Sequence, residues 1–461
     1  MKIDNIEVVD AASDGTAVAK KDEMVYFIPY AAPGDVVNIE TYKTKKSYCM
    51  GRILEIVKPS EHRVQPFCKH YGLCGGCKWQ HLNYESQLFF KQKQVVDALT
   101  RIGKINVDNL SPIVAAEKTQ FYRNKLEFTF SNFKWMVDGD FKDKADRNLN
   151  GVGFHLANMY DRIVDIDECF FQAPPSNEIR NEIRKYAIEH GMTFHNVKKH
   201  EGLLRNLIIR QSNTGGLMVV IVVSNENDNT FFDLMDHIKN TFPQITSLMY
   251  IINGKLNDDY SDLDVMLYHG DDHFIEQMEN IKFYVGPKSF YQTNHEQAYK
   301  LYKIARTFAD LQGNETVYDL YTGTGTIANF VAQKAKHVVG IEYVKQAVDD
   351  AKINSKINSI ANTTFYHGDM AKILTDDFIA SNGYPNVVIT DPPRAGMHEK
   401  VVRQLISCKP EKIVYVSCNP ATQARDVNML ADYYEIGRIQ PVDMFPHTQH
   451  VENVMELKLK A

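Results

Sequence analysis

The stretch that decides the fold is "VYDLYTGTGTIANFVA", residues 317–332. It reads as a short apolar strand, a glycine turn and a helix. Gly323 and Gly325 have G-x-G spacing, and Ala328 completes G-x-G-x-x-A. Glycines allow a sharp turn and bring a ligand close to the N-terminus of the following helix. The pattern predicts a nucleotide-type site, although an ordinary tight turn would look similar.

The sequence around this stretch predicts a parallel sheet. Apolar runs of strand length alternate with helix-length segments, which indicates βαβ units. The runs are "TVYDLY", "HVVGIE", "TTFYHGD", "NVVITD" and "KIVYVS". The last two candidate strands, "YYEIGRIQPVDMF" and "ENVMELKLK", are joined by a loop too short for a crossover helix. We expect them to pair antiparallel at one edge of a Rossmann-like domain that covers residues 281–461.

Acidic residues at the predicted strand ends narrow the choice of ligand. Glu342 ends "VVGIE", where a carboxylate accepts hydrogen bonds from ribose hydroxyls of either NAD or S-adenosylmethionine. Asp369 follows in "YHGDM", and Asp391 begins "DPPRAG" at another strand end, where two prolines make the loop rigid. Asp-Pro-Pro resembles a signature of nucleic-acid methyltransferases and does not resemble dehydrogenases.

The N-terminal 58 residues predict a small β-barrel. Five short strand patterns, separated by turn signals, suggest a closed barrel of the OB type, which often binds nucleic acid. The whole chain has a net charge of −6, but residues 41–125 carry 15 Lys and Arg against 6 Asp and Glu. Such a basic region suits contact with backbone phosphates, although an ordinary solvated surface is an equal alternative.

Residues 59–280 predict a central α+β domain. A helix pattern over residues 83–103 precedes alternating segments that suggest an antiparallel sheet, including a hairpin at "SNTGG", residues 212–216. The domain starts with "FCKHYGLCGGCKWQH", in which Cys68, Cys74 and Cys77 have the spacing C-x5-C-x2-C. Cys169, 92 residues after Cys77, is the best-placed fourth ligand of a structural metal site. Four thiolates suit either zinc or an iron-sulfur cluster, so the spacing leaves the metal open.

Cys418 lies between a predicted strand and a helix start, in "VYVSCNPATQARD", residues 414–426. It could be a buried hydrophobic residue, a metal ligand or a nucleophile. The edge of a ligand crevice and the N-terminus of a helix both favour the thiolate, so we expect a nucleophile.

Taken together, these motifs resemble the S-adenosylmethionine-dependent RNA uracil-5-methyltransferases. The resemblance is to members with an N-terminal TRAM barrel and an iron-sulfur cluster, which methylate 23S ribosomal RNA. It covers nearly the whole chain, through the cysteine motif, "FYRNKLEFTF", "FYQTNHEQA", "DLYTGTGTIA", "DPPRAG", "VYVSCNPATQARD" and "FPHTQHVENV".

The resemblance implies a role for each matching residue. Cys418 is the expected nucleophile and Glu452 the expected general base. The expected S-adenosylmethionine contacts are Gln292, Tyr321, Glu342 and Asp391, and Thr326 occupies a further contact position where the family often has Asn; Gly323, Gly325 and Asp369 complete this group. The four ligands of a [4Fe-4S] cluster are expected to be Cys68, Cys74, Cys77 and Cys169.

The alternatives are a transfer-RNA uracil-5-methyltransferase, a non-catalytic RNA-binding module and an NAD-dependent enzyme. The first is disfavoured because that branch generally lacks the barrel and the cysteine motif. No apolar run is long enough to span a membrane, and seven cysteines do not suggest a disulfide framework. We therefore expect a cytoplasmic monomer that acts on ribosomal RNA.

Overall fold

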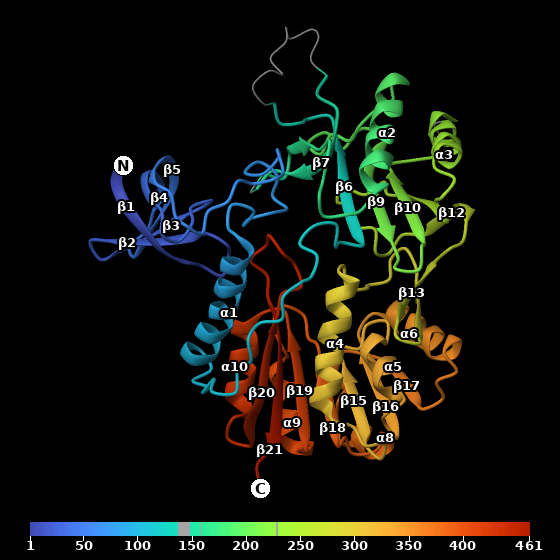
Figure 1. Cartoon of the computed structure of the whole chain (residues 1–461). Coiled ribbons are helices and arrows are strands. Elements are labelled where there is room, and N and C mark those ends of the chain that lie inside the picture. Colours follow the sequence, from blue (N-terminus) through green and yellow to red (C-terminus); the bar gives the residue numbers. More distant parts are fainter. Residues whose placement is uncertain (137–147, 158, 227–228) are drawn as a thin grey trace.

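The computed structural model describes residues 1–136, 148–157, 159–226 and 229–461. A small barrel projects to one side of a body that contains a central sheet and a C-terminal sheet (Figure 1). No helix within these described ranges is long and apolar enough to cross a membrane.

The N-terminal residues form the expected five-stranded barrel. Its strands are β1 (Lys2–Ala11), β2 (Ala17–Lys21), β3 (Met24–Ile28), β4 (Val36–Thr44) and β5 (Tyr48–Lys58). The strand order is β1-β2-β3-β5-β4, and β4 closes the barrel on β1. Inward-facing Ile6, Val8, Val37 and Ile39 are almost fully buried, as alternation along barrel strands requires.

A long connection leads from the barrel to the central sheet. It contains the cysteine motif and then α1 (Tyr84–Arg101), whose first turn is capped when Asn83 accepts a hydrogen bond from the Ser86 amide. Val95 and Leu99 of α1 lie one turn apart and are buried in the core of the C-terminal domain. The helix therefore belongs structurally to the C-terminal sheet, although it precedes the central one in sequence.

The central sheet has seven strands in the order β12-β11-β10-β9-β6-β7-β8. They are β6 (Lys125–Ser131), β7 (Gly151–His155), β8 (Ile163–Asp165), β9 (Leu204–Gln211), β10 (Leu217–Val223), β11 (Ser247–Ile252) and β12 (Val265–Gly270). Two helices, α2 (Ser176–Glu189) and α3 (Asn229–Thr241), flank this sheet (Figure 1).

The hairpin at residues 212–216 is confirmed, because β9 and β10 pair antiparallel on either side of it. The expectation of a purely antiparallel sheet was wrong. Strands β10 and β11 pair in parallel, and α3 provides the crossover between them. The continuous burial of β10 is typical of a strand that is covered on both faces.

The C-terminal sheet confirms the predicted alternation of strands and helices. Its order is β17-β16-β15-β18-β19-β21-β20. The strands are β15 (Thr316–Leu320), β16 (His337–Glu342), β17 (Thr363–His367), β18 (Val387–Thr390), β19 (Lys412–Ser417), β20 (Tyr434–Val442) and β21 (Glu452–Leu459). The helices are α4 (His295–Ala309), α5 (Thr326–Ala332), α6 (Lys345–Ile357), α7 (Met370–Ile373), α8 (Asp376–Asn382), α9 (Glu399–Cys408) and α10 (Pro420–Leu430).

The two expected antiparallel strands confirm the prediction. They pair with each other at one edge of the sheet, and β21 lies between β19 and β20. The last strand of the chain thus lies inside the sheet, beside the strand that precedes Cys418.

The predicted boundary after residue 280 falls within a hairpin of β13 (Phe274–Met278) and β14 (Ile281–Val285). One hydrophobic cluster also runs from the central sheet into the C-terminal sheet, and it includes Met218 and Val317. The two sheets thus share a core. The domain boundary at residue 280 stays a prediction.

Candidate active site

One edge of the C-terminal sheet carries the majority of the expected site residues. The turn from Tyr321 to Gly325 follows β15, Glu342 ends β16, Asp391 follows β18 and Cys418 follows β19. These four strands are parallel, so their carboxyl ends lie at the same edge. The connection order changes direction between β15 and β18, and open α/β sheets bind ligands at such switch points.

The glycine turn leaves room for a ligand. Gly323 and Gly325 have φ angles of 56° and 72°, the left-handed region that glycine adopts at no steric cost. A Cβ atom on Gly325 would come within 2.8 Å of the Ala351 Cβ, whereas one on Gly323 would meet no atom within 4 Å. Gly325 therefore permits close packing, and Gly323 faces open space. Thr326 begins α5 and is buried, with its hydroxyl 3.3 Å from that of Thr324.

Glu342 and Asp369 have backbone partners. The carboxylate of Glu342 accepts hydrogen bonds from the amides of Gly323 (3.1 Å) and Val344 (2.8 Å). The carboxylate of Asp369 accepts one from the amide of Ala371 and so caps α7. Both acids therefore lie at the carboxyl ends of parallel strands, and these hydrogen bonds orient their side chains.

Gln292 and Tyr321 approach the edge from other directions. Gln292 lies between β14 and α4, and its carbonyl accepts a hydrogen bond from the Asn124 side chain at 3.0 Å. Its side chain interacts with the hydroxyl of Tyr302, which is buried on α4. Tyr321 is partly buried and has a φ of 63°.

The sheet brings Cys418 and Glu452 face to face. Ser417 pairs with Asn453 in the antiparallel ladder between β19 and β21. The next residue of each strand toward the edge is therefore Cys418 on one side and Glu452 on the other. Glu452 is only 6% exposed, while Cys418 is partly exposed. The pairing joins two residues that are 34 positions apart in sequence.

The expected preference of Cys418 for the thiolate was wrong for the free protein. Burial, then the negative charges of Glu452 and Asp391, raise the pKa of the Cys418 thiol to about 11. Arg394 acts in the opposite direction and lowers it. Burial is the largest cause, because a poorly solvated site disfavours the charged thiolate.

Buried acids dominate the electrostatics of this edge. Burial and the neighbouring Asp391 raise the pKa of Glu452 well above its ordinary value, and burial raises that of Asp391 to about 7. Asp319, at the end of β15, also has a pKa raised to about 7 by burial. Clusters of carboxyl groups with raised pKa values are typical of functional sites.

Sequence reasoning missed three residues of this cluster: Asp319, Tyr302 and Arg394. Asp319 accepts a hydrogen bond from the Ala328 amide at 2.9 Å beneath the glycine turn, and its second carboxylate oxygen has no partner among the described residues. The position of Asp319 shortly before the glycine turn in the sequence could have indicated its role. Arg394 was quoted within "DPPRAG" but given no role, and Tyr302 lies on a helix pattern that shows no sign of the site.

The raised carboxyl pKa values predict a stability that depends on pH. The folded pKa of Asp391 lies above its ordinary value of 3.8, so the folded protein binds more protons than the unfolded chain between about pH 4 and pH 7. Its stabilising contribution is complete below about pH 4 and is lost as the pH rises through 7. As the pH rises from 5 to 8, the unfolding free energy of the unsubstituted protein should fall. In Asp391→Asn this fall should be smaller by about 1 kcal/mol or more.

Denaturant unfolding at several pH values measures this difference. Asp432→Asn, at an exposed carboxyl outside the site, is the matched control and should follow the unsubstituted protein. An Asp391→Asn variant with the same pH dependence as that control would contradict the prediction.

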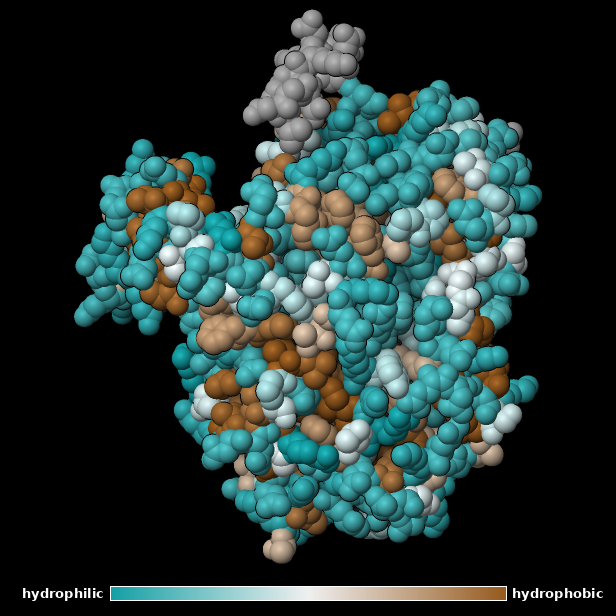
Figure 2. All heavy atoms as spheres, in the orientation of Figure 1, coloured by the Kyte–Doolittle hydropathy of each residue, from teal (hydrophilic) through white to brown (hydrophobic). Residues whose placement is uncertain are grey.

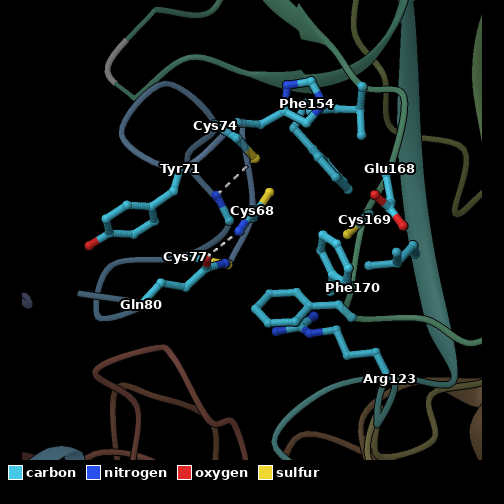
Figure 3. Close-up of a pocket in the computed structure, with 15 residues that line it drawn as sticks. Cys68, Tyr71, Cys74, Cys77, Gln80, Arg123, Phe154, Glu168, Cys169 and Phe170 are labelled. Atoms are coloured by element: carbon cyan, nitrogen blue, oxygen red, sulfur yellow. Dashed lines mark hydrogen bonds between the residues drawn. The ribbon is translucent and has the colours of Figure 1, made fainter. Parts of the chain in front are cut away.

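The four expected metal-binding cysteines line one cavity (Figure 3). Cys68, Cys74 and Cys77 reach it from the motif after the barrel, and Cys169 from the segment between β8 and α2. Burial, together with the charges of Cys169 and Cys68, raises the pKa of Cys74 to about 12. The structure thus brings together four thiols that the sequence separates by up to 101 positions.

Hydrogen-bond donors point at two of these sulfur atoms. The Gly76 amide lies 3.4 Å from the Cys74 sulfur, and the Gln80 side chain lies 3.1 Å from the Cys77 sulfur (Figure 3). Such donors stabilise thiolate ligands. Throughout the described ranges, no three Cys, His, Asp or Glu side chains are grouped tightly enough for a single metal ion. What the structure shows of the four thiols is that they line the same cavity.

The remaining candidates have structural partners. His447 bonds to Gln87, and His450 lies 3.3 Å from the Arg394 guanidinium. Arg123 stacks on the rings of Phe171 and Phe445, at 5.3 Å and 5.1 Å. It lies at the wall of the cysteine cavity.

Comparison with known proteins identifies relatives along the whole chain. Residues 271–460 match the family model of tRNA (uracil-5-)-methyltransferases. An uncharacterized RNA methyltransferase of Bacteroides thetaiotaomicron is 53% identical over 97% of this chain and all of its own length. Another, from Halalkalibacterium halodurans, is 38% identical over 100% of this chain and 98% of its own. The crystal structure of Pyrococcus abyssi tRNA (uracil-54, C5)-methyltransferase with S-adenosyl-L-homocysteine is 29% identical, covers 99% of this chain and 100% of its own, and has a TM-score of 0.75.

Proposed function

This chain belongs to the S-adenosylmethionine-dependent RNA uracil-5-methyltransferases, and from that premise we propose that it methylates C5 of a uridine in 23S ribosomal RNA through a covalent bond between Cys418 and C6. The observation that carries the mechanism is the position of Cys418 opposite Glu452 at the ligand-binding edge of the sheet. A nucleophile and a base in contact with the same site are what this reaction needs.

The proposed roles of the two residues follow from the chemistry of uracil. C5 is a weak nucleophile until the sulfur of Cys418 adds to C6, which converts the C5–C6 double bond into an enolate with its electrons available at C5. S-adenosylmethionine supplies the electrophilic methyl group that C5 takes up. Glu452 then accepts the C5 proton, the electrons of the C5–H bond restore the C5–C6 double bond, and the bond between sulfur and C6 breaks.

Burial raises the pKa of both groups in the free protein, so the proposed mechanism needs a charge that favours their ionised forms. Arg394 is the cationic side chain that acts on both: its guanidinium lowers the pKa of Cys418 and that of Glu452. The target base must also leave its stack, because its two faces have to meet different groups.

The proposed S-adenosylmethionine site is the glycine turn of residues 321–325 and the neighbouring carboxyl ends of the parallel strands. The space above Gly323 would receive the cofactor, and the carboxylates of Glu342 and Asp369 would bind its hydroxyl and amino groups. Gln292, Tyr321, Gly325, Thr326 and Asp391 complete the proposed contacts. The unpartnered oxygen of Asp319 lies beneath the same turn and fits a polar ligand.

The four cysteines would hold a [4Fe-4S] cluster. Their sulfur atoms line one cavity, two of them receive N–H donors, and the cationic side chain of Arg123 lines the same cavity. Four thiolates suit either a cluster or a zinc ion, and the resemblance to cluster-containing members of the family supports the cluster. A cluster bound there would tie the motif after the barrel to the central domain, which is a structural role.

Anaerobic purification should therefore yield protein with about four iron and four sulfide per chain. We expect Cys74→Ser to lose most of the iron, whereas Cys49→Ser, at a buried thiol in the barrel, should keep it. Iron, sulfide and zinc analysis measures the outcome, and zinc without iron would contradict the cluster.

The barrel offers a surface for the RNA. Tyr42 is 58% exposed at the end of β4, and Lys43, Lys45 and Lys46 beside it are exposed as well. Hydrophobic residues also gather on the barrel surface in Figure 2. Lysines contact phosphates and aromatic rings stack on bases, so this end of the barrel suits single-stranded segments.

A transfer-RNA substrate is the second candidate. The structure of the Pyrococcus abyssi tRNA (uracil-54, C5)-methyltransferase matches 99% of this chain. The presence of the N-terminal regions therefore does not by itself distinguish an enzyme for ribosomal RNA from one for transfer RNA. Mapping 5-methyluridine in ribosomal and transfer RNA from cells with and without this protein tests the proposal. We expect one position of 23S ribosomal RNA to lose its methyl group; a loss confined to transfer RNA would overturn the ribosomal assignment, and no loss in either would overturn the proposed activity.

A further inference from the structure

The loop between β20 and β21, residues 443–451, leads directly into Glu452. It lies next to α1 in Figure 1, and its residues are buried except for Phe445, Gln449 and His450, which are partly buried. The position of Glu452 depends on this loop at one end, because Glu452 is the first residue of β21 and pairs with Val442 of β20, the residue that directly precedes the loop.

An ion pair without solvent contact fixes the start of the loop. The side chains of Lys91 and Asp443 are both 0% exposed and meet at 2.5 Å. The Lys91 ammonium also donates to the Phe445 carbonyl at 2.9 Å, and the Tyr84 hydroxyl donates to the other oxygen of Asp443 at 2.8 Å. Two residues of the loop, Asp443 and Phe445, are thus tied to two side chains on one face of α1.

The middle of the loop is held as firmly. His447 has a φ of 64°, an uncommon conformation for a large side chain that persists only when its surroundings impose it. Its amide donates to the Gln87 side chain at 2.7 Å, and its carbonyl accepts from the amides of Lys78 and Trp79, both at 3.0 Å. The α1 helix and the segment after the cysteines therefore hold the loop from one side.

We propose that α1 positions the general base: Lys91, with Tyr84 and Gln87, clamps the 443–451 loop so that the carboxylate of Glu452 stays within reach of C5. This inference rests on the proposed function. Burying two charges is costly, and an apolar pair of similar volume would often be as stable, so stability alone does not explain the ion pair. A base must lie within hydrogen-bonding distance of its proton, and an error of about 1 Å costs about 10²-fold in rate.

Lys91→Met tests the clamp, with Lys93→Met as the matched control. Lys93 lies on the same helix, but its ion pairs with Asp10 and Asp97 are partly exposed and contribute little. The double variant Lys91→Met with Asp443→Asn removes both charges and restores stability without restoring the ion pair. Tyr84→Phe, which deletes a single hydroxyl, is a milder change to the same clamp.

The measurements are kcat, the KM values for RNA and S-adenosylmethionine, thermal unfolding, and the fraction of enzyme in a covalent RNA complex on denaturing gels. Because Cys418 directly follows β19 and is not part of the 443–451 loop, the covalent complex should still form, but proton removal should slow. For Lys91→Met and for the double variant we expect a 10- to 100-fold lower kcat, near-normal KM values and accumulation of the covalent complex. Tyr84→Phe should show a smaller decrease in kcat. Lys93→Met should show no decrease.

A double variant that unfolds at the normal temperature and also turns over normally would overturn the clamp, even if the single variant fails to fold. Glu452→Gln serves as the reference for accumulated complex. If it accumulates complex while the Lys91 variants turn over normally, only the clamp is overturned. If it accumulates none, the assignment of Glu452 as base fails, and the clamp fails with it.

Discussion

Cys418→Ala is expected to abolish methyl transfer, with a loss on the order of 10⁴-fold or more, while binding of RNA and S-adenosylmethionine persists. Alanine removes the sulfur that must add to C6, and Cys418 directly follows Ser417, which pairs with Asn453 beside Glu452. Without that addition, C5 does not become nucleophilic enough to take up the methyl group. Transfer of a radioactive methyl group to RNA measures the rate, and gel shift measures binding.

Cys408→Ala is the matched control. Cys408 is also a partly buried thiol of the C-terminal domain, and burial raises its pKa to about 11 as well, but it lies at the end of α9 and not at the ligand edge. We expect it to keep full activity. Equal activity in the Cys418 and Cys408 variants would remove Cys418 from the mechanism.

Glu452→Gln is expected to lower turnover by about 10²- to 10⁴-fold and to trap the RNA on the enzyme. Glutamine keeps the size and the hydrogen-bonding capacity of the side chain but does not accept the C5 proton. Addition of Cys418 and methyl transfer precede that step, so the methylated RNA should stay bound to the sulfur. A band that survives denaturing electrophoresis and carries the methyl label measures this state.

The removal of a buried acid gives a second readout. Because the pKa of Glu452 is raised well above its ordinary value, the variant should be at least as stable as the unsubstituted protein near pH 8. Glu435→Gln, at an exposed carboxyl on the neighbouring strand β20, should change neither turnover nor stability. Normal turnover without a trapped complex in Glu452→Gln would assign the base to another group.

Several local features of the fold were predictable because they depend on residues close in sequence. The glycine turn at Gly323 and Gly325 needs left-handed backbone angles that glycine adopts freely, and the flanking apolar run and helix pattern specify β15 and α5. The barrel strands and the β9–β10 hairpin follow from alternation and turn residues in the same way. The parallel pairing of β10 with β11 was missed because strand direction depends on a partner that α3 separates from β10.

The sequence by itself determined the strand–turn–helix unit, the order of strands and helices that builds the C-terminal sheet, and the residue types available for chemistry. Only the tertiary structure decided how those residues meet. The insertion of β21 between β19 and β20 places Glu452 opposite Cys418, and folding of the central domain brings Cys169 to the other three cysteines. The same burial sets the pKa values of the site, because desolvation depends on surroundings that distant segments supply.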